Sequence, residues 1–495
     1  MKKRIFAILL AAMLAAPMLF SCAGDTAEET AAENSAGGEN AAVEAETEPS
    51  WQYPDKDFAG QDYRILNFDQ LWDMYIHMDV TEQTGEILND AVYNRNRKVE
   101  EELNCKIVEK AMTNTGNVLT ELSDHAKNSI MAGSDEYEIM QLAVNQDISL
   151  VTSGYLMDLM SIEGFQLQET WWDQDIIDAT TLNGKLYFAS GAANLMAFDS
   201  MWCLFFNESM MADYDLEKPY DLVREGKWTI DKLSEYCAAV ANLNEDASFT
   251  WNKDGSCVWG ISAHVNCPEK FYFASGIRAT ETLDDGSINY IMESDKFYSV
   301  IDKLATLLNG KTGMTLYAST TDFDAEAGGY VYVFTTRRSM FMTGEIKAAQ
   351  LMRDMEDTFG ILPYPKYDEA QSEYQTTLVS QLMYLTVPTT NTNLDLTATV
   401  SEVMAHDSYT SVIPVYYSSV VEHKGLRNED SIEMLEIMRA NRDVDIAVVF
   451  SWNNTIREQV REKLFAGDNQ VASIMASQKS VVESNIQKFV EFLNE

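Results

Sequence analysis

The sequence predicts an α/β protein that folds as two lobes. Short apolar runs of strand character alternate with amphipathic runs of helical spacing, which is typical of βαβ units around a largely parallel sheet. The second observation is length. Folded structure is expected from Trp51 onward, and these about 445 residues exceed what one hydrophobic core usually holds. We therefore expect two α/β lobes.

The first elements follow from hydrophobic spacing. Apolar residues recur every three or four positions over 87–103 and 119–130, and this period indicates amphipathic helices. Short runs between and beside them indicate strands at 63–68, 106–109 and 137–143. We expect these segments to form a parallel sheet with helices packed on it.

The later elements carry boundary signals as well as apolar runs. Thr229 follows Trp228 and is the expected N-cap of a helix, because its hydroxyl can accept a hydrogen bond from the first turn. Residues 284–286, Asp-Asp-Gly, form a hairpin signal. Further strands are expected at 184–188, 202–206, 359–362 and 381–387, and further helices around 304–308 and over 471–493.

The N-terminus has the layout of an export signal. Residues 2–4 are cationic, residues 5–20 are almost wholly apolar, and Ser21 is a small residue before Cys22. The run 19–22 resembles a bacterial lipobox, where a diacylglycerol is attached to the cysteine and the preceding peptide is removed. A transmembrane helix is the alternative, but the apolar run is shorter than the roughly 20 residues that a span needs.

We therefore expect residues 1–21 to be a lipoprotein signal peptide and Cys22 to be the lipidated first residue of the mature protein. Two acyl chains are enough for stable anchoring, which would hold the protein at the extracytoplasmic face of the cell membrane. Residues 22–50 are rich in Ala, Glu, Gly and Thr, contain no Lys or Arg, and have almost nothing to bury. This composition predicts a disordered acidic linker.

Charge and cysteine content exclude several classes of function. The formal net charge of −42 argues against nucleic acid and against a peripheral membrane-binding face, since both need a cationic footprint. The histidines and the cysteines after Cys22 follow no metal-ligand spacing, so we expect neither a metal site nor a cofactor. An odd number of cysteines argues against a disulfide framework, although Cys257 and Cys267 are close enough in sequence to pair.

Motifs of moderate specificity are spread over nearly the whole mature chain. In chain order they are DFAG at 57–60, TGEILNDA at 84–91 with Arg95-Asn96, FFN at 205–207, YDLV at 220–223, GKWT at 226–229 and FGILPYPK at 359–366. Together they resemble the extracellular solute-binding protein family 1, the carbohydrate-binding receptor lipoproteins of ABC importers. None of the motifs is a catalytic signature.

The resemblance implies a two-lobe, periplasmic-binding-protein-like fold with a cleft between the lobes and hinge strands that cross between them. Lobe one would comprise residues 51–200 and 376–425, and lobe two residues 201–375 and 426–495. The crossings would fall near 199–207, 374–381 and 424–430. The implied function is capture of an oligosaccharide by hinge closure and its delivery to the transmembrane subunits of an ABC permease, by a monomer without enzymatic activity.

A saccharide site needs aromatic platforms for the C–H faces of the sugar and amides or carboxylates for its hydroxyls. In open α/β sheets, ligands lie beyond the carboxyl ends of strands, and this rule selects Asp69, Gln70, Trp72, Asn145 and Gln146. The crossing and the resemblance add Ser200, Trp202, Tyr272, Glu345 and Trp452, and the resemblance places Glu345 in a turn at the start of a helix. Of the adjacent Trp171 and Trp172, one is expected to face the cleft, and we assign Trp172.

Plainer interpretations of these residues stay open. Asp69 and Asn145 could be turn or cap residues, and Trp202 could be a core residue. Two other functions are also compatible with the sequence: a surface glycoside hydrolase that uses two carboxylates, and an adhesive lipoprotein that has no part in transport.

Overall fold

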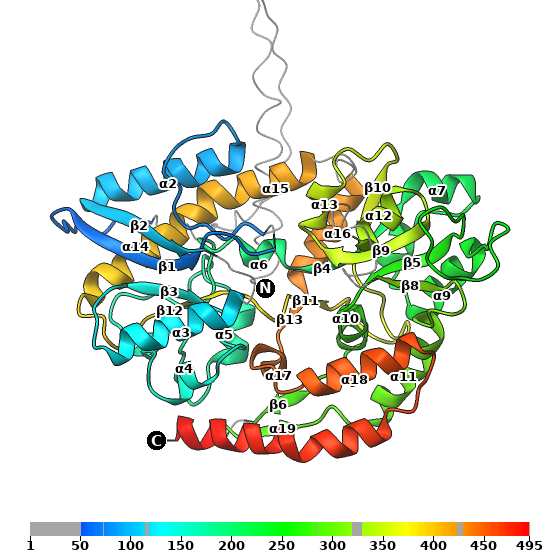
Figure 1. The fold of residues 1–495 in the computed structure, drawn as a ribbon. Helices are drawn as coiled ribbons and strands as arrows, with labels where there is room; N and C mark the ends of the chain where they lie inside the picture. The colour runs from blue at the N-terminus through cyan, green and yellow to red at the C-terminus, as the bar shows by residue number, and fades with distance from the viewer. Residues whose placement is uncertain are drawn as a thin grey trace, which may run out of the picture. The chain divides into compact units, whose positions relative to one another are not determined.

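The computed structural model describes residues 51–72, 74–113, 118–283, 285–318, 329–422 and 429–494. The chain divides into two compact units, Met1–Pro54 and Asp55–Glu495, and all elements below belong to the second unit (Figure 1). The predicted signal peptide, Cys22 and the acidic linker lie outside the described residues.

One sheet has the strand order β12-β3-β1-β2. Its strands are β1 (Gln61–Phe68), β2 (Cys105–Met112), β3 (Ile139–Leu142) and β12 (Tyr384–Thr386). β1 runs parallel to β2 and β3, with Tyr63 opposite Ile107 and Ile65 opposite Ile139. β12 is antiparallel to β3, so a strand from late in the sequence completes a sheet that begins with the first strand.

A second sheet has the order β10-β4-β9-β5-β8. Its strands are β4 (Trp202–Asn207), β5 (Trp259–His264), β8 (Thr315–Ala318), β9 (Ser339–Glu345) and β10 (Phe359–Leu362). β5 is parallel to β8 and β9, whereas β4 is antiparallel to β9 and β10. Every residue of β4 and β9 is buried, which is expected of strands covered on both faces.

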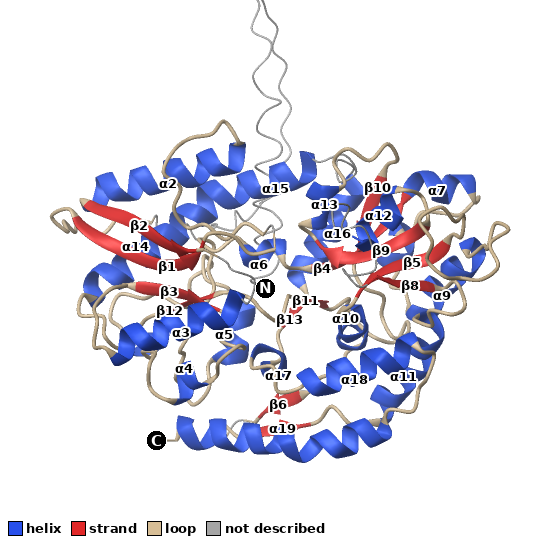
Figure 2. Ribbon diagram, in the orientation of Figure 1, coloured by secondary structure: helices blue, strands red, loops and turns tan. Residues whose placement is uncertain are grey.

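Helices pack beside each sheet (Figure 2). Beside the first sheet lie α2 (Ile87–Leu103), α3 (Val118–Met131) and α14 (Leu394–Asp407), and beside the second lie α9 (Ile230–Val240), α10 (Cys267–Ala274), α11 (Asp295–Leu307), α12 (Gly329–Thr335) and α18 (Asn454–Phe465). Among them, α2, α3, α9 and α11 were predicted from the sequence. Glu86 caps α2 by accepting from the backbone N–H groups of Leu88 and Asn89. Thr229 caps α9, as predicted, by accepting from the N–H of Lys232 at 3.3 Å.

The remaining elements are shorter or connect the two sheets. They are α4 (Ser149–Thr152), a 3₁₀ turn (Leu159–Ser161), α5 (Gln174–Thr180), α6 (Met196–Asp199), α7 (Glu208–Asp213), α8 (Tyr220–Arg224), β6 (Thr280–Thr282), β7 (Ile288–Tyr290), α13 (Ala348–Leu351), β11 (Thr376–Thr377), a π-helical turn (Ser408–Val412), α15 (Ile413–Glu422), α16 (Glu429–Ala440), β13 (Arg442–Asp443), α17 (Ile446–Val449) and α19 (Ala472–Leu493).

Chain segments that connect the two sheets meet at a junction between them. β11 and β13 pair in parallel, with Thr376 opposite Arg442, and Figure 1 shows this pair between the two sheets. The N–H of Val379 donates to the carbonyl of Ser200 at 3.2 Å. Arg442 also reaches Asp173 beside the first sheet, donating to its two carboxylate oxygens at 2.7 and 2.8 Å. The junction is therefore held by backbone bonds and a buried ion pair.

Helix α19 contacts segments of both sheets. It packs against α18 and β7, and its last residues reach the loop after α5. There, Lys185 Nζ donates to the carbonyl of Leu493 at 3.0 Å, and the ring of Tyr187 lies 5.5 Å from that of Phe492. The predicted apolar stripe of this helix is buried, including Ile486 and Phe489.

Most of the predicted elements are confirmed, and three need correction. Residues 184–188 are not a strand: Leu182 and Lys185 exchange backbone hydrogen bonds around a tight turn in which Asn183 and Gly184 both have positive φ. The strand predicted at 381–387 is shorter, because only β12 pairs. Glu345 is the last residue of β9 and does not lie in a turn at a helix start.

Two other expectations concern cysteines and membrane spans. All five cysteines in the described part of the chain are buried and unpaired, so Cys257 and Cys267 form no disulfide. Within the described ranges, no helix combines the length and the apolar character that a membrane crossing requires.

Candidate functional site

A cluster of buried polar side chains lies at the junction of the two sheets, and we call it the junction cluster. It consists of Asn145, which follows β3; Ser200 and Trp202, at the start of β4; Glu269 and Lys270 on α10; Ser380, which follows β11; and Asn453 and Arg457, at the start of α18. Each of these residues is at most 8% exposed. The cluster thus draws on segments beside both sheets.

An ion pair forms the centre of the cluster. Lys270 Nζ donates to Glu269 Oε2 at 3.1 Å and to the carbonyl of Leu378 at 3.2 Å. Asn453 Nδ2 donates to the other oxygen of the Glu269 carboxylate at 3.3 Å. A buried charge pair of this kind is stable only when further hydrogen bonds satisfy it, and here the backbone at the junction and α18 provide them.

Trp202 is the largest side chain of the cluster and is 1% exposed. Lys270 Nζ lies 5.4 Å from the centre of its ring, and the His264 ring packs edge-on at 5.1 Å. Burial lowers the pKa of His264; Glu345, the strand neighbour of Trp202, opposes this shift, while Lys347, Lys270 and Arg461 add to it. The tryptophan therefore lies among more cations than carboxylates.

Direct hydrogen bonds join the parts of the cluster that come from distant segments. Asn145 Nδ2 donates to Ser451 Oγ at 3.1 Å, which connects the loop after β3 to the segment before α18. Arg457 Nη1 donates to Ser380 Oγ at 3.4 Å. Together with the bond from Val379 to Ser200, these contacts make one continuous network across the junction.

Several polar atoms of the network have no hydrogen-bond partner among the described residues. These atoms are Asn145 Oδ1, Ser200 Oγ, Trp202 Nε1, Asn453 Oδ1 and Arg457 Nε. An unsatisfied buried polar group costs about 1–3 kcal/mol, so native structures rarely leave several of them together. Two amide oxygens, one hydroxyl and two N–H donors are the groups that a hydroxyl-rich ligand would satisfy.

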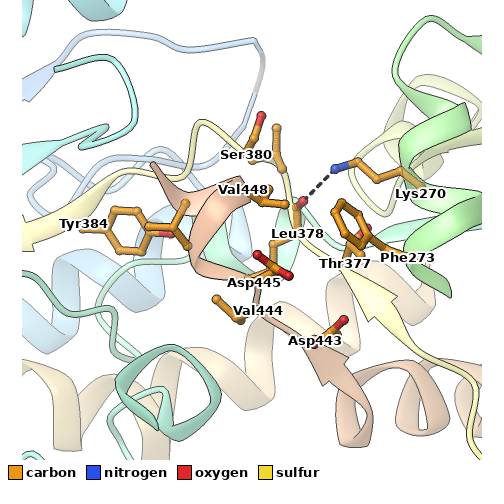
Figure 3. Close-up of a pocket in the computed structure, with 12 residues that line it drawn as sticks. Lys270, Phe273, Thr377, Leu378, Ser380, Tyr384, Asp443, Val444, Asp445 and Val448 are labelled. Atoms are coloured by element: carbon orange, nitrogen blue, oxygen red, sulfur yellow. Dashed lines mark hydrogen bonds between the residues drawn. The ribbon is translucent and has the colours of Figure 1, made fainter. Parts of the chain in front are cut away.

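A cavity adjoins the cluster, and Lys270, Leu378 and Ser380 belong to its wall (Figure 3). The cavity offers about 30 Å³, which is room for no more than a few water molecules. Pockets for small-molecule ligands usually measure about 300–1,000 Å³. A sugar could therefore reach the cluster only if the segments around it moved apart.

Two acidic residues also line this cavity (Figure 3). Burial raises the pKa of Asp443 to about 7, against the effect of the neighbouring Arg278. Burial also raises the pKa of Asp445, but this carboxylate accepts from the N–H groups of Ala279 and Ala447 at 2.7 and 2.9 Å. Asp445 therefore fastens the start of α17 and does not present a free carboxylate.

The structure brings several of the predicted site residues together. Asn145, Ser200 and Trp202 belong to the junction cluster, and Glu345 pairs with Trp202 between strands β4 and β9. Trp452 precedes Asn453, but its ring stacks on Phe450 at 5.3 Å. Its contribution there is packing.

Trp172 and Tyr272 lie in the core. The indole nitrogens of Trp171 and Trp172 both donate to Glu402, at 2.7 and 2.8 Å, so neither faces a cleft. Tyr272 is fully buried, with its ring edge-on to Phe273 at 4.9 Å. Its hydroxyl has no partner among the described residues.

Four of the predicted loop residues, three after β1 and one after β3, are outside the cluster. Asp69 is half-buried, and Gln70 and Gln146 are exposed. Trp72 is 39% exposed, and its carbonyl accepts a hydrogen bond from Lys347 Nζ, which follows β9. This contact links the loop after β1 to the second sheet.

The sequence reasoning missed Glu269, Lys270, Ser380, Asn453 and Arg457. One signal was present: the charged pair Glu269-Lys270 interrupts an otherwise apolar helix, Cys267–Ala274, whose residues are all buried. Charges on a buried helix need partners, but their partners lie more than 100 positions away in the sequence. In the part of the chain that the structure describes, no three His, Cys, Asp or Glu residues are placed to hold a metal ion.

No family model matches the sequence, and no curated protein matches it. Solved structures do. An ABC substrate-binding protein from Listeria monocytogenes in complex with cycloalternan is 13% identical and has a TM-score of 0.54, covering 86% of this chain and 99% of its own. The maltose/maltodextrin-binding domain from Bdellovibrio bacteriovorus bound to maltotriose is 14% identical, has a TM-score of 0.53, and covers 86% of this chain and 100% of its own.

A sugar transporter protein from Rhizobium etli in an open conformation is 14% identical, has a TM-score of 0.56, and covers 88% of this chain and 99% of its own. These similarities extend over nearly the whole described chain and show its fold. The protein has the two-lobe α/β fold of periplasmic binding proteins, as predicted.

Proposed function

We propose that this protein is the substrate-binding lipoprotein of an ABC importer, which captures an oligosaccharide between its lobes and delivers it to a membrane permease. The observation that carries the proposal is the junction cluster. It combines a tryptophan, amides and a hydroxyl at the junction of the two sheets, and it leaves hydrogen-bonding atoms unsatisfied. The structures that share this fold include proteins bound to cycloalternan and to maltotriose.

Binding in this proposal needs hinge closure. The cluster is buried and its cavity is far smaller than a sugar, so the structure corresponds to a closed arrangement that must open to admit ligand. Lobe one would comprise residues 51–200 and 376–425, and lobe two residues 201–375 and 426–495. The contacts of α19 with both lobes would make it one of the elements that adjust on closure.

The cellular setting belongs to the same proposal. Signal peptide cleavage before Cys22 and its lipidation would anchor the protein at the extracytoplasmic face of the membrane, with residues 22–50 as a flexible linker. The protein would act as a monomer that meets the permease in its closed form. It would bind without reacting, because Lys270 and Asn453 hold the Glu269 carboxylate instead of leaving it available as a general acid or base.

Asn453 gives a specific test of the site. Asn453→Ala removes an unpartnered amide oxygen from the cluster, and we expect it to weaken saccharide binding about tenfold, the effect of one hydrogen bond. Calorimetric titration with maltotriose, cyclic and linear glucans, galactans and xylans would measure this. Asn469→Ala is the matched control, because Asn469 is exposed and outside the cluster.

The outcomes of this titration are distinct. Saccharide binding that Asn453→Ala weakens and Asn469→Ala leaves unchanged supports the site. No binding of any saccharide by the wild-type protein contradicts the proposed function, and turnover of a glycoside by the purified protein supports a hydrolase instead.

A further inference from the structure

Arg457 differs from the other buried cation of the junction cluster. Lys270 has a carboxylate partner at 3.1 Å, whereas the hydrogen bond that the Arg457 guanidinium makes among the described residues goes to the hydroxyl of Ser380 at 3.4 Å. Among the described residues, the only carboxylate within 4 Å of Arg457 is that of Glu458, 3.9 Å from Nη2 and on a side chain that is 57% exposed. Arg457 Nε has no partner in the same part of the chain. Arg457 is nevertheless 92% buried, since only 8% of it is exposed.

Arg442 shows how this chain pairs a buried guanidinium with carboxylates, although its Nε, like that of Arg457, has no partner among the described residues. Its two terminal nitrogens bind both oxygens of Asp173, and one of them also reaches Asp175 at 3.1 Å. An ionised group without such compensation is costly to bury. The guanidinium of Arg457 can present a fork of N–H donors that matches a planar carboxylate, and no carboxylate of the described residues lies within hydrogen-bond distance of it.

The charges around the cluster also favour an anionic ligand. The whole chain carries a formal charge of −42, yet Lys270 lies over the Trp202 ring, and Lys347, Lys270 and Arg461 lower the pKa of the neighbouring His264 against the effect of Glu345. With Glu269 neutralised by Lys270, the cluster itself keeps one cation in excess, Arg457, while Asp443 and Asp445 line the adjoining cavity. A buried excess cation is suited to binding an anion.

We infer that the saccharide bound at the junction cluster is acidic, and that Arg457 binds its carboxylate while Trp202 and the amides of Asn145 and Asn453 contact the rest of the ring. The inference rests on the proposed function and names the class of sugar, a uronic-acid-containing oligosaccharide. Closure of the lobes over such a ligand supplies the carboxylate that the buried guanidinium lacks. A neutral sugar would leave Arg457 buried and uncompensated.

The test compares charged and neutral forms of the same sugar. The probes are trisaccharides of galacturonate, glucuronate and mannuronate, each paired with its carboxyl-reduced counterpart, and binding to the purified protein is measured by calorimetry. At least one uronate trisaccharide should bind about tenfold or more tightly than its reduced counterpart, as expected for a hydrogen bond to a charged group. This comparison uses only the wild-type protein.

Variants then assign the preference to Arg457. In Arg457→Gln, the preference for the uronate trisaccharide over its reduced counterpart should fall to about twofold or less, since a neutral amide cannot form an ion pair with the carboxylate. In Arg457→Lys, which restores a positive charge, part of this preference should return. Arg353→Gln is the control, because it removes the same charge from a side chain that is 71% exposed. Thermal unfolding confirms that each variant is folded.

Each result has one meaning. Equal or tighter binding of the neutral members overturns the inference and leaves the proposed function standing. A charge preference that persists in a folded Arg457→Gln variant also overturns it. Binding of neither series, nor of any other saccharide, overturns the proposed function itself.

Discussion

At the scale of single residues, the candidate site contains buried polar atoms that have no hydrogen-bond partner among the described residues. Glu402 shows the ordinary outcome, because it is buried and accepts from Gln166 N–H and from both Trp171 and Trp172. Trp202 Nε1 and Ser200 Oγ are equally buried but have no partner among the described residues. Trp259 Nε1 is also buried without a described partner, so Trp202 is distinguished by its place beside Lys270 and Ser200 at the junction.

The sequence could identify part of this site and not the rest. Asn145, Ser200 and Trp202 were predictable because they lie next to strand ends or at an expected crossing, which are local features. Lys270 and Arg457 were not, because their significance depends on which residues face them. Leu378 lies 108 positions from Lys270, and Ser380 lies 77 positions from Arg457. The burial of Trp172 could not be predicted either, because its partner, Glu402, lies 230 positions away.

Asp443 makes a prediction about pH at the residue scale. Burial raises the pKa of its carboxyl from 3.8 to about 7, with Asp445 and Asp175 adding to the shift and Arg278 opposing it. Between these two pH values the folded protein keeps a proton that the unfolded chain has lost. The contribution of this group to the free energy of unfolding therefore decreases as pH rises through that window.

The substitution Asp443→Asn should remove this group's contribution to the pH dependence of the free energy of unfolding. Urea unfolding at several pH values should show that the variant gains stability relative to wild type as pH rises from 3.8 to about 7. Asp354→Asn, at a side chain that is 94% exposed, is the control. A difference between Asp443→Asn and wild type that stays constant over this range would contradict the assignment.

At the scale of elements, hydrophobic period and caps were sufficient for most helices and strands. The apolar stripe of α2 and the Thr229 cap of α9 lie where the sequence placed them. The error at 184–188 came from reading apolar residues as a strand when Asn183 and Gly184 form a tight turn, a pair that favours positive φ. The pairing of β11 with β13 could not be predicted, because each strand has only two residues.

At the element scale, the ion pair between Arg442 of β13 and Asp173 leads to a testable prediction. Arg442→Met leaves the buried carboxylate of Asp173 without its ion-pair partner, and we expect a loss of about 3–5 kcal/mol in the free energy of unfolding. Denaturant unfolding monitored by circular dichroism measures this.

Arg224→Met is the control for Arg442. Hydrogen bonds with Glu433, Asp430 and Asp221 raise the pKa of Arg224, yet its side chain is 33% exposed. Water screens this group, so its removal should cost about 1 kcal/mol or less. Equal effects of the two substitutions would contradict the structural role of Arg442.

At the scale of the whole molecule, the two-lobe α/β fold places the junction cluster between the two sheets. The order of βα units along the chain was enough to predict the fold class. It could not predict that β12 returns to the first sheet or that α19 contacts segments beside both sheets. These long-range contacts join late segments of the sequence to both parts of the fold, and in the proposed function the lobes move apart before a ligand enters.

Small-angle X-ray scattering of the purified protein, with and without an oligosaccharide that it binds, tests this account most directly. The account predicts that the ligand-free protein is more extended than the structure described here and that its radius of gyration decreases on saturation toward the value of that structure. A radius of gyration that matches the closed structure without ligand and does not change when the saccharide binds would contradict it.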